Sequence, residues 1–133
     1  MGKEISIWNG YQVYGNVTEL DNIVEANGLI RLEKEDIINT LSKNGKNYVA
    51  EGKDSNITDA FNIVLKDLPC KIENIKNLLI NFQCGSLQPN AMELSNITSH
   101  LSANPEINIK WGLSSDSSLG ESYKVILVAS TDC

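Results

Sequence analysis

Two short stretches of the chain are apolar at nearly every position, Leu78–Phe82 and the middle of Tyr123–Ala129. A strand with one face in water alternates apolar and polar residues, so continuous runs are typical of strands that are covered on both faces. A third stretch, Ile107–Leu113, does alternate, as expected of a strand with one wet face. The chain is therefore expected to fold around a sheet with helices packed on it.

Four helical segments are expected, three before these strands and one between Phe82 and Ile107. Apolar residues recur at helical spacing in four segments, 17–26, about 35–43, 56–68 and 89–103. The first two should end at the Asn-Gly pairs Asn27-Gly28 and Asn44-Gly45, since Asn and Gly accept the left-handed conformation that closes many helices. Proline should stop the other two, at Pro69 and at Asn104-Pro105.

The N-terminal residues predict a hairpin. Ile5–Tyr14 contains two short β-rich runs joined by Asn9-Gly10, which suits a type I′ turn. A further short strand is expected at Tyr48–Ala50, and the last two strands of the chain are expected to pair antiparallel. The predicted fold is α+β: a two-layer sandwich with a mixed four-stranded sheet, preceded by the hairpin at 1–15, in a single domain spanning 1–133.

Composition excludes several classes of function. The net charge of −6, without a cluster of lysine or arginine, argues against nucleic acid as a partner, because that affinity depends on neutralising phosphates. No run approaches the roughly 18 apolar residues of a membrane span. Three cysteines, Cys70, Cys84 and Cys133, fit reduced thiols and a cytoplasmic location. The chain has no glycine-rich phosphate loop, nucleophile motif or metal-ligand cluster, so we expect no cofactor, no metal and no catalytic residue of its own.

Several short pieces, taken in their order and spacing, resemble one known family. They are Gly28-Leu29-Ile30 followed by an acidic segment, Asn47-Tyr48 leading to Gly52, Leu78–Gly85, Ile109–Gly112 and Val125–Ala129. Together they resemble the C-terminal domain of FtsZ, the bacterial tubulin homologue and filament-forming GTPase of cell division, over residues 17–129. The resemblance implies a tubulin/FtsZ C-terminal-domain-like fold.

In that family the loop after Gly-Leu-Ile reads Asn-x-Asp-x-x-Asp, enters the nucleotide site of the next subunit and helps to position the hydrolytic water. The matching segment here runs from Arg31 to Asp36, with Arg31 in place of the asparagine, Glu33 in place of the middle aspartate and Asp36 at the last acidic position. The resemblance thus makes Glu33 and Asp36 a candidate activating loop. Glu33 carries its carboxylate one methylene further out, although catalytic groups must be placed to within roughly 0.5 Å.

The same segment has a plainer interpretation, because acidic residues also stabilise the start of a helix through the helix dipole. As a contact surface, the loop would offer Arg31, Glu33, Glu35 and Asp36 to a partner. Trp8 and Tyr11 are further interaction candidates, since exposed aromatic residues often anchor interfaces. Alternatively, these aromatic rings cover an open side of the sheet.

The expected function follows from the resemblance. The chain should act as a protein-interaction or filament-contact module in cell division or cytoskeletal assembly, with an FtsZ/tubulin-like protein as partner. It should not be an enzyme on its own, and GTP should be met only through a partner subunit or a further domain. Two alternatives remain: a self-associating scaffold unrelated to division, and a small-molecule-binding α/β sandwich.

Overall fold

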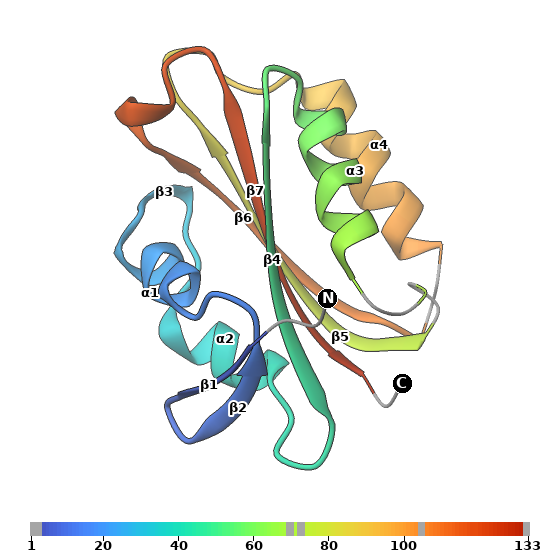
Figure 1. Ribbon diagram of the computed structural model, residues 1–133. Helices are drawn as coiled ribbons and strands as arrows, with labels where there is room; N and C mark the ends of the chain where they lie inside the picture. Colours follow the sequence, from blue (N-terminus) through green and yellow to red (C-terminus); the bar gives the residue numbers. More distant parts are fainter. Residues whose placement is uncertain (1–3, 69–70, 72–73, 104–105, 132–133) are drawn as a thin grey trace.

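One mixed sheet runs through the molecule (Figure 1). The computed structural model describes residues 4–68, 71, 74–103 and 106–131. Within these residues the sheet has seven strands in the order β1-β2-β4-β7-β5-β6-β3. The strands are β1 (Ile5–Trp8), β2 (Tyr11–Tyr14), β3 (Asn27–Ile30), β4 (Lys46–Asp54), β5 (Ile75–Cys84), β6 (Asn108–Ser115) and β7 (Tyr123–Thr131). The helices are α1 (Thr18–Glu25), α2 (Lys34–Thr40), α3 (Ile57–Asp67) and α4 (Ala91–Ser102).

Helices cover both faces of this sheet (Figure 1). On β5, Leu78 and Ile80 enter one core with α3 and α4, whereas Leu79 enters the other core with α1, α2 and the hairpin. β7 divides its residues in the same way, with Leu127 in the first core and Ile126 in the second. The two apolar runs are therefore buried on both faces, as predicted. The predicted two layers become three, because alternate residues of one strand supply two separate cores and each core needs its own cover.

The α+β class is confirmed, but the sheet has seven strands where four were predicted. The hairpin joins the sheet through a parallel contact between β2 and β4 at Tyr14 and Tyr48. The other addition is β3, at the residues where Asn27-Gly28 was predicted to end a helix. Gly28 does not have a positive φ, and it pairs with Ser114 of β6. The unpaired edge of β6 offers β3 hydrogen-bond partners, which local sequence cannot reveal.

The predicted pairing of the last two strands is wrong. β6 pairs in parallel with β5, with Leu78 opposite Ile109, and its other neighbour is β3. β7 lies between β4 and β5 and is antiparallel to both. A strand that is apolar on both faces belongs at the centre of the sheet, whereas the alternating β6 lies nearer its margin. The strand predicted at Tyr48–Ala50 is longer than expected: β4 has nine residues, and all nine pair with β7.

The hairpin forms as predicted, with Asn9 and Gly10 at φ values of 50° and 84°. After β2 the chain turns away from β4 at Gly15, whose φ is 117°. A Cβ there would lie 2.3 Å from the carbonyl oxygen of Val49, so only glycine fits this close approach. The turn ends the pairing of β2 with β4 after a single register pair.

The ends of the helices agree in part with the prediction. Asn56 caps α3, and its side chain accepts a hydrogen bond from the Asp59 N–H at 3.1 Å. Helix α4 begins one residue after Asn90, which serves as its cap. Helix α2 ends at Thr40, before the Asn44-Gly45 pair predicted to end it. Pro69, Cys70, Asn104-Pro105 and Cys133 lie outside the described residues.

Candidate functional site

The acidic segment predicted from the sequence connects β3 to α2 at one margin of the sheet. Leu32, in its middle, is buried and lies against β6 at Gly112. A Cβ on Gly112 would lie 2.5 Å from Leu32 Cγ and 2.6 Å from the Ile30 carbonyl oxygen, so the absence of a side chain there lets the segment approach the strand. Leu32 thus fixes the segment to the sheet, while Arg31 and Glu33 on either side of it remain exposed.

Asp36 is held by neighbours within the chain. Its Oδ2 accepts a hydrogen bond from the Glu33 N–H at 2.8 Å, which closes the first turn of α2. Its Oδ1 lies 3.5 Å from Lys110 Nζ on β6, and only 21% of the side chain is exposed. The Asp36 carboxylate therefore stabilises the start of α2, as the plainer interpretation of the segment predicts, and little of this side chain faces solvent.

The members of the segment that face solvent are Arg31, Glu33, Lys34 and Glu35. The Arg31 guanidinium Nε lies 2.9 Å from Glu33 Oε1, and both side chains are more than 60% exposed. An exposed ion pair of this kind contributes little to stability. Arg31 and Glu33 can therefore separate at little cost and each pair with a charged group on another molecule. The arrangement offers a charged, anchored contact surface, which we call the acidic loop (Arg31–Asp36).

The two aromatic candidates lie at the hairpin. Trp8 is only 7% exposed and belongs to the core beneath α1 and α2; its Nε1 donates a hydrogen bond to Asp21 Oδ1 at 3.0 Å. Tyr11 is half-buried, with Lys43 Nζ 4.2 Å from its ring centroid. The structure thus places Trp8 where it covers the sheet and leaves part of Tyr11 accessible.

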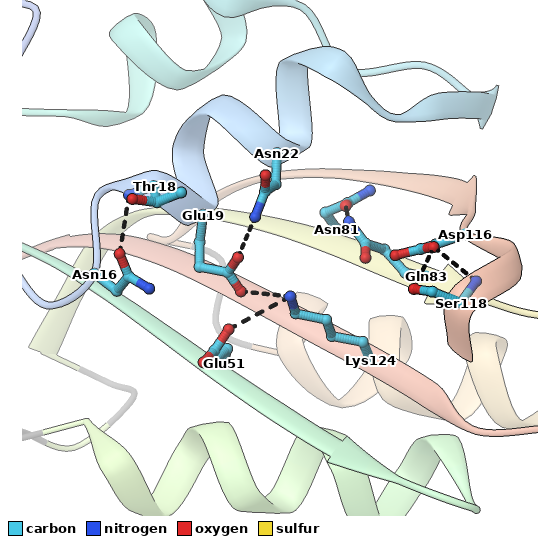
Figure 2. Close-up of polar contacts among 10 residues, drawn as sticks. All are labelled: Asn16, Thr18, Glu19, Asn22, Glu51, Asn81, Gln83, Asp116, Ser118 and Lys124. Atoms are coloured by element: carbon cyan, nitrogen blue, oxygen red, sulfur yellow. Dashed lines mark hydrogen bonds and ion pairs between the residues drawn. The ribbon is translucent and has the colours of Figure 1, made fainter. Parts of the chain in front are cut away.

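A second polar cluster lies on the sheet face under α1, and sequence reasoning missed it (Figure 2). Lys124 Nζ of β7 lies 2.7 Å from Glu19 Oε2 of α1 and 3.5 Å from Glu51 Oε2 of β4. The Glu19 side chain is 5% exposed and also accepts a hydrogen bond from the Asn22 amide. The only sequence signal was an acidic residue within the apolar pattern of α1, and its partner is too distant in sequence to be recognised.

Buried amides continue this cluster along β5. Gln83 Nε2 donates to Asn81 Oδ1 at 2.7 Å (Figure 2). Asn81 Nδ2 in turn donates to Ser114 Oγ at 2.9 Å. A hollow of about 430 Å³ opens beside them, lined in part by Gln83, Asp116 and Lys124. Hydrogen bonds from the Ser118 hydroxyl at 2.7 Å and the Ser118 N–H at 3.0 Å lower the pKa of Asp116. The cluster connects to α1 through the pair of Lys124 with Glu19.

Other features that would indicate a function are a metal site, a reactive thiol, a positioned histidine and a membrane-spanning helix. The described residues contain no group of three His, Cys, Asp or Glu side chains placed to bind a metal ion. Burial raises the pKa of the Cys84 thiol, which favours its unreactive protonated form. His100 is exposed on α4. No described helix has the length and apolar character needed to span a bilayer.

Comparison with solved structures relates the fold of this chain to known proteins, whereas sequence comparison does not. No protein-family model matches the sequence, and no curated protein is significantly similar to it. Among solved structures, an empty FtsZ dimer from M. jannaschii aligns with 86% of this chain at a TM-score of 0.69 and 21% identity. This chain has an FtsZ C-terminal-domain-like fold. The aligned region is 35% of that FtsZ chain, so the present chain spans about a third of its solved neighbour.

More distant neighbours share this fold. TubZ from Bacillus thuringiensis serovar israelensis, solved as GDP-form protofilaments, aligns with 80% of this chain and 31% of its own at a TM-score of 0.59 and 14% identity. TubZ in a GTPγS-form protofilament aligns with 86% of this chain at 15% identity. Identities this low establish the common fold, and the roles of individual residues remain predictions.

Proposed function

We propose that this chain is a filament-contact module, which docks its acidic loop on the nucleotide-bearing face of an FtsZ-type subunit. The observation that supports the proposal is the exposure of a loop that is fixed to the sheet. Leu32 is buried against β6, while the charged side chains of Arg31 and Glu33 are exposed. Its fold neighbours include an FtsZ dimer and TubZ protofilaments, which assemble through copies of one chain.

The two ends of such a filament differ, so the module is expected to act at one end only. In a head-to-tail contact, one face of each subunit meets a different face of the next. A chain that offers the loop face occupies the filament end at which a nucleotide-bearing face is free. If it presents no nucleotide face in return, growth at that end stops, and a small amount of the chain should shorten many filaments.

The proposal assigns no nucleotide binding to the chain itself. The sequence contains no glycine-rich loop that would place several backbone N–H groups around a phosphate. Nucleotide would then enter the complex only on the partner subunit. The exposed side chains of Arg31 and Glu33 would meet it there, whereas Asp36 stays engaged by Glu33 and Lys110.

A sedimentation assay tests this function. The wild-type chain is added below stoichiometry to polymerising FtsZ of the same organism, and pelleted polymer is measured. We expect less polymer with wild type and a several-fold weaker effect with the Arg31→Ala/Glu33→Ala double variant, because both exposed charges are lost. Loss of Glu33 also removes the N-cap side chain of α2, which costs about 1 kcal/mol and leaves the chain folded. The matched control, Glu106→Ala, removes an exposed acid outside the loop and should act as wild type does. Unchanged polymer at equimolar chain would refute the proposal.

Self-association is a second candidate, favoured by the apolar side chains on the outermost strand β1. Ile5 and Ile7 there are 52% and 63% exposed, and among the strands that the structure describes only β2 lies beside β1. Uncovered edge strands readily pair with another copy. Ile7→Lys should then convert a dimer into a monomer in light scattering. A wild-type chain that is monomeric at high concentration removes this candidate.

A further inference from the structure

The edge of β4 beyond Tyr48 has no strand beside it among the described residues. The pair between Tyr14 and Tyr48 is the one register pair between β2 and β4, and the next residue, Gly15, lies close against Val49 without continuing the pairing. On its other side β4 remains paired with β7 as far as Asp54. In an antiparallel ladder, alternate residues direct their N–H and C=O groups away from the partner strand. Residues 50–54 therefore carry main-chain groups that no described strand pairs with on this side.

This open edge lies at the bottom of a groove. One hollow of about 480 Å³ is lined by Asn16 and Glu19 on the α1 side and by Ile63 and Lys66 on the α3 side. A second hollow of about 380 Å³ continues past Gly52 and Lys53. Glu51 and Ile63 line both hollows, so the two hollows adjoin along the strand.

The wall on the α3 side stands close to the strand. A Cβ on Gly52 would lie 2.5 Å from the Ala60 carbonyl oxygen and 3.0 Å from Ile63 Cβ, so glycine allows the helix to approach β4 closely. Ile63 is 42% exposed and faces the groove. The opposite wall is charged, because Glu51 lies against the Lys124–Glu19 pair under α1 (Figure 2).

We propose that this groove binds an extended peptide segment of a partner protein, which adds to the sheet as a further strand beside residues 50–54. Main-chain hydrogen bonds supply affinity in this mode of recognition, and side-chain pockets on the two walls supply specificity. Five strand residues span about 17 Å, so a segment of five to seven residues fills the open edge. The contact is separate from the acidic loop and does not depend on it.

The chemistry of the two walls defines the segment. Side chains of an added strand point alternately to the two faces of the sheet. Those on the α3 side meet Ile63 and should be apolar. Those on the α1 side meet Glu51, whose side chain is 49% exposed, and two residues further on Lys53. In a strand that runs parallel to β4, as β2 does at this edge, the segment reads apolar, basic, apolar, acidic, apolar, with the basic residue opposite Glu51.

Hydrogen exchange with a probe peptide tests the proposal. The probe is acetyl-Ser-Thr-Val-Lys-Ile-Glu-Val-Thr-Ser-amide, added to the whole chain at millimolar concentration. We expect the outward-pointing amides among residues 50–54 to exchange at least tenfold more slowly, with no such change at β1. Two N-methylated versions, methylated at odd or at even positions, separate main-chain pairing from side-chain contact. One should retain binding and the other should lose it, because only one edge of the peptide pairs with β4.

Variants of the two walls give an independent measurement by fluorescence anisotropy of the labelled probe. Glu51→Lys and Ile63→Ser should each weaken binding about tenfold, and a probe with glutamate in place of its lysine should regain affinity for Glu51→Lys. The matched controls Glu106→Lys and Met92→Ser change an exposed acid and an exposed apolar residue elsewhere and should bind as wild type does. Equal binding of both N-methylated probes, or unprotected β4 amides, would overturn the proposal. Protection of the same amides by increasing protein concentration alone would assign the edge to a second copy and would also overturn it.

Discussion

The buried carboxylate of Glu19 is a polar contact between α1 and the sheet, beside the core residues Leu20 and Ile23 of the same helix. Its oxygens accept from Asn22 and pair with Lys124 at 2.7 Å, and almost none of the side chain reaches solvent. Removing one partner of a buried ion pair leaves the other uncompensated, which is far more costly than the net value of the pair. Glu19 and Lys124 should therefore behave as a single unit in mutagenesis.

We predict that Lys124→Met lowers the free energy of unfolding by about 3 kcal/mol, because it leaves the Glu19 carboxylate buried without its cation. The double variant Glu19→Gln/Lys124→Met should recover at least half of this loss, since no buried charge remains. Chemical denaturation of the four proteins of this cycle supplies the values. Additive effects of the two single substitutions would show that the pair is not coupled.

Asp116 should show a pH dependence with a defined cause. The Ser118 hydroxyl, followed by the Ser118 N–H, lowers the pKa of Asp116 below the ordinary value of 3.8. A carboxyl with a lowered folded pKa stabilises the fold above its unfolded pKa, and this contribution is lost as pH falls through the folded pKa. Ser118→Ala should raise the pKa of Asp116 towards its ordinary value in an NMR titration. A pKa that does not move in this variant would rule out the hydroxyl as the main cause.

At the scale of residues, the sequence indicated the start of α2 at the acidic loop better than the internal contacts of the loop. Acidic residues before a helix are visible in a sequence, and Glu33 does precede the first residue of α2. The ion pair of Asp36 with Lys110 and the burial of Trp8 depend on distant strands. Such contacts are set by the packing of the sheet, which no local pattern specifies.

At the scale of elements, Gly112 couples β6 to the segment that carries the acidic loop. A methyl group there would meet Leu32 Cγ at 2.5 Å and the Ile30 carbonyl at 2.6 Å. We predict that Gly112→Ala costs about 1–3 kcal/mol, because β3 and Leu32 must move away from β6. The same variant should weaken the effect on FtsZ polymer, because it displaces the anchored loop. As a control, Gly120→Ala meets no atom within 4 Å but is strained at a φ of 60°, so it should lose stability without affecting the loop.

Elements defined by local rules were predicted well, and those defined by partners were not. The hairpin needed only Asn9-Gly10 between β-rich runs, and α3 needed a cap at Asn56 and an apolar stripe. In contrast, β3 exists because the edge of β6 accepts it, and β7 is central because it pairs with both β4 and β5. Pairing between distant strands is decided by the whole sheet, so four strands were predicted where seven form.

At the scale of the whole molecule, helices cover both faces of the sheet. The margins of the sheet therefore remain as the places where the proposed contacts with other proteins form. The acidic loop lies at the β3 margin, the exposed isoleucines at the β1 margin, and the open part of β4 between α1 and α3. Each margin presents a different chemistry: charge, apolar surface and main-chain hydrogen bonds. The apolar runs of β5 and β7 predicted the covered faces, but they carry no information on which margins remain open.

The most direct test of the proposed filament contact is imaging of single FtsZ filaments with a fluorescently labelled chain. A loop that docks on a nucleotide-bearing face finds a free one at only one end of a polar filament. The expected result is one label at one end of each filament, with growth halted at that end and labelling reduced for Arg31→Ala/Glu33→Ala. Label along the filament sides, at both ends, or absent from filaments would contradict it.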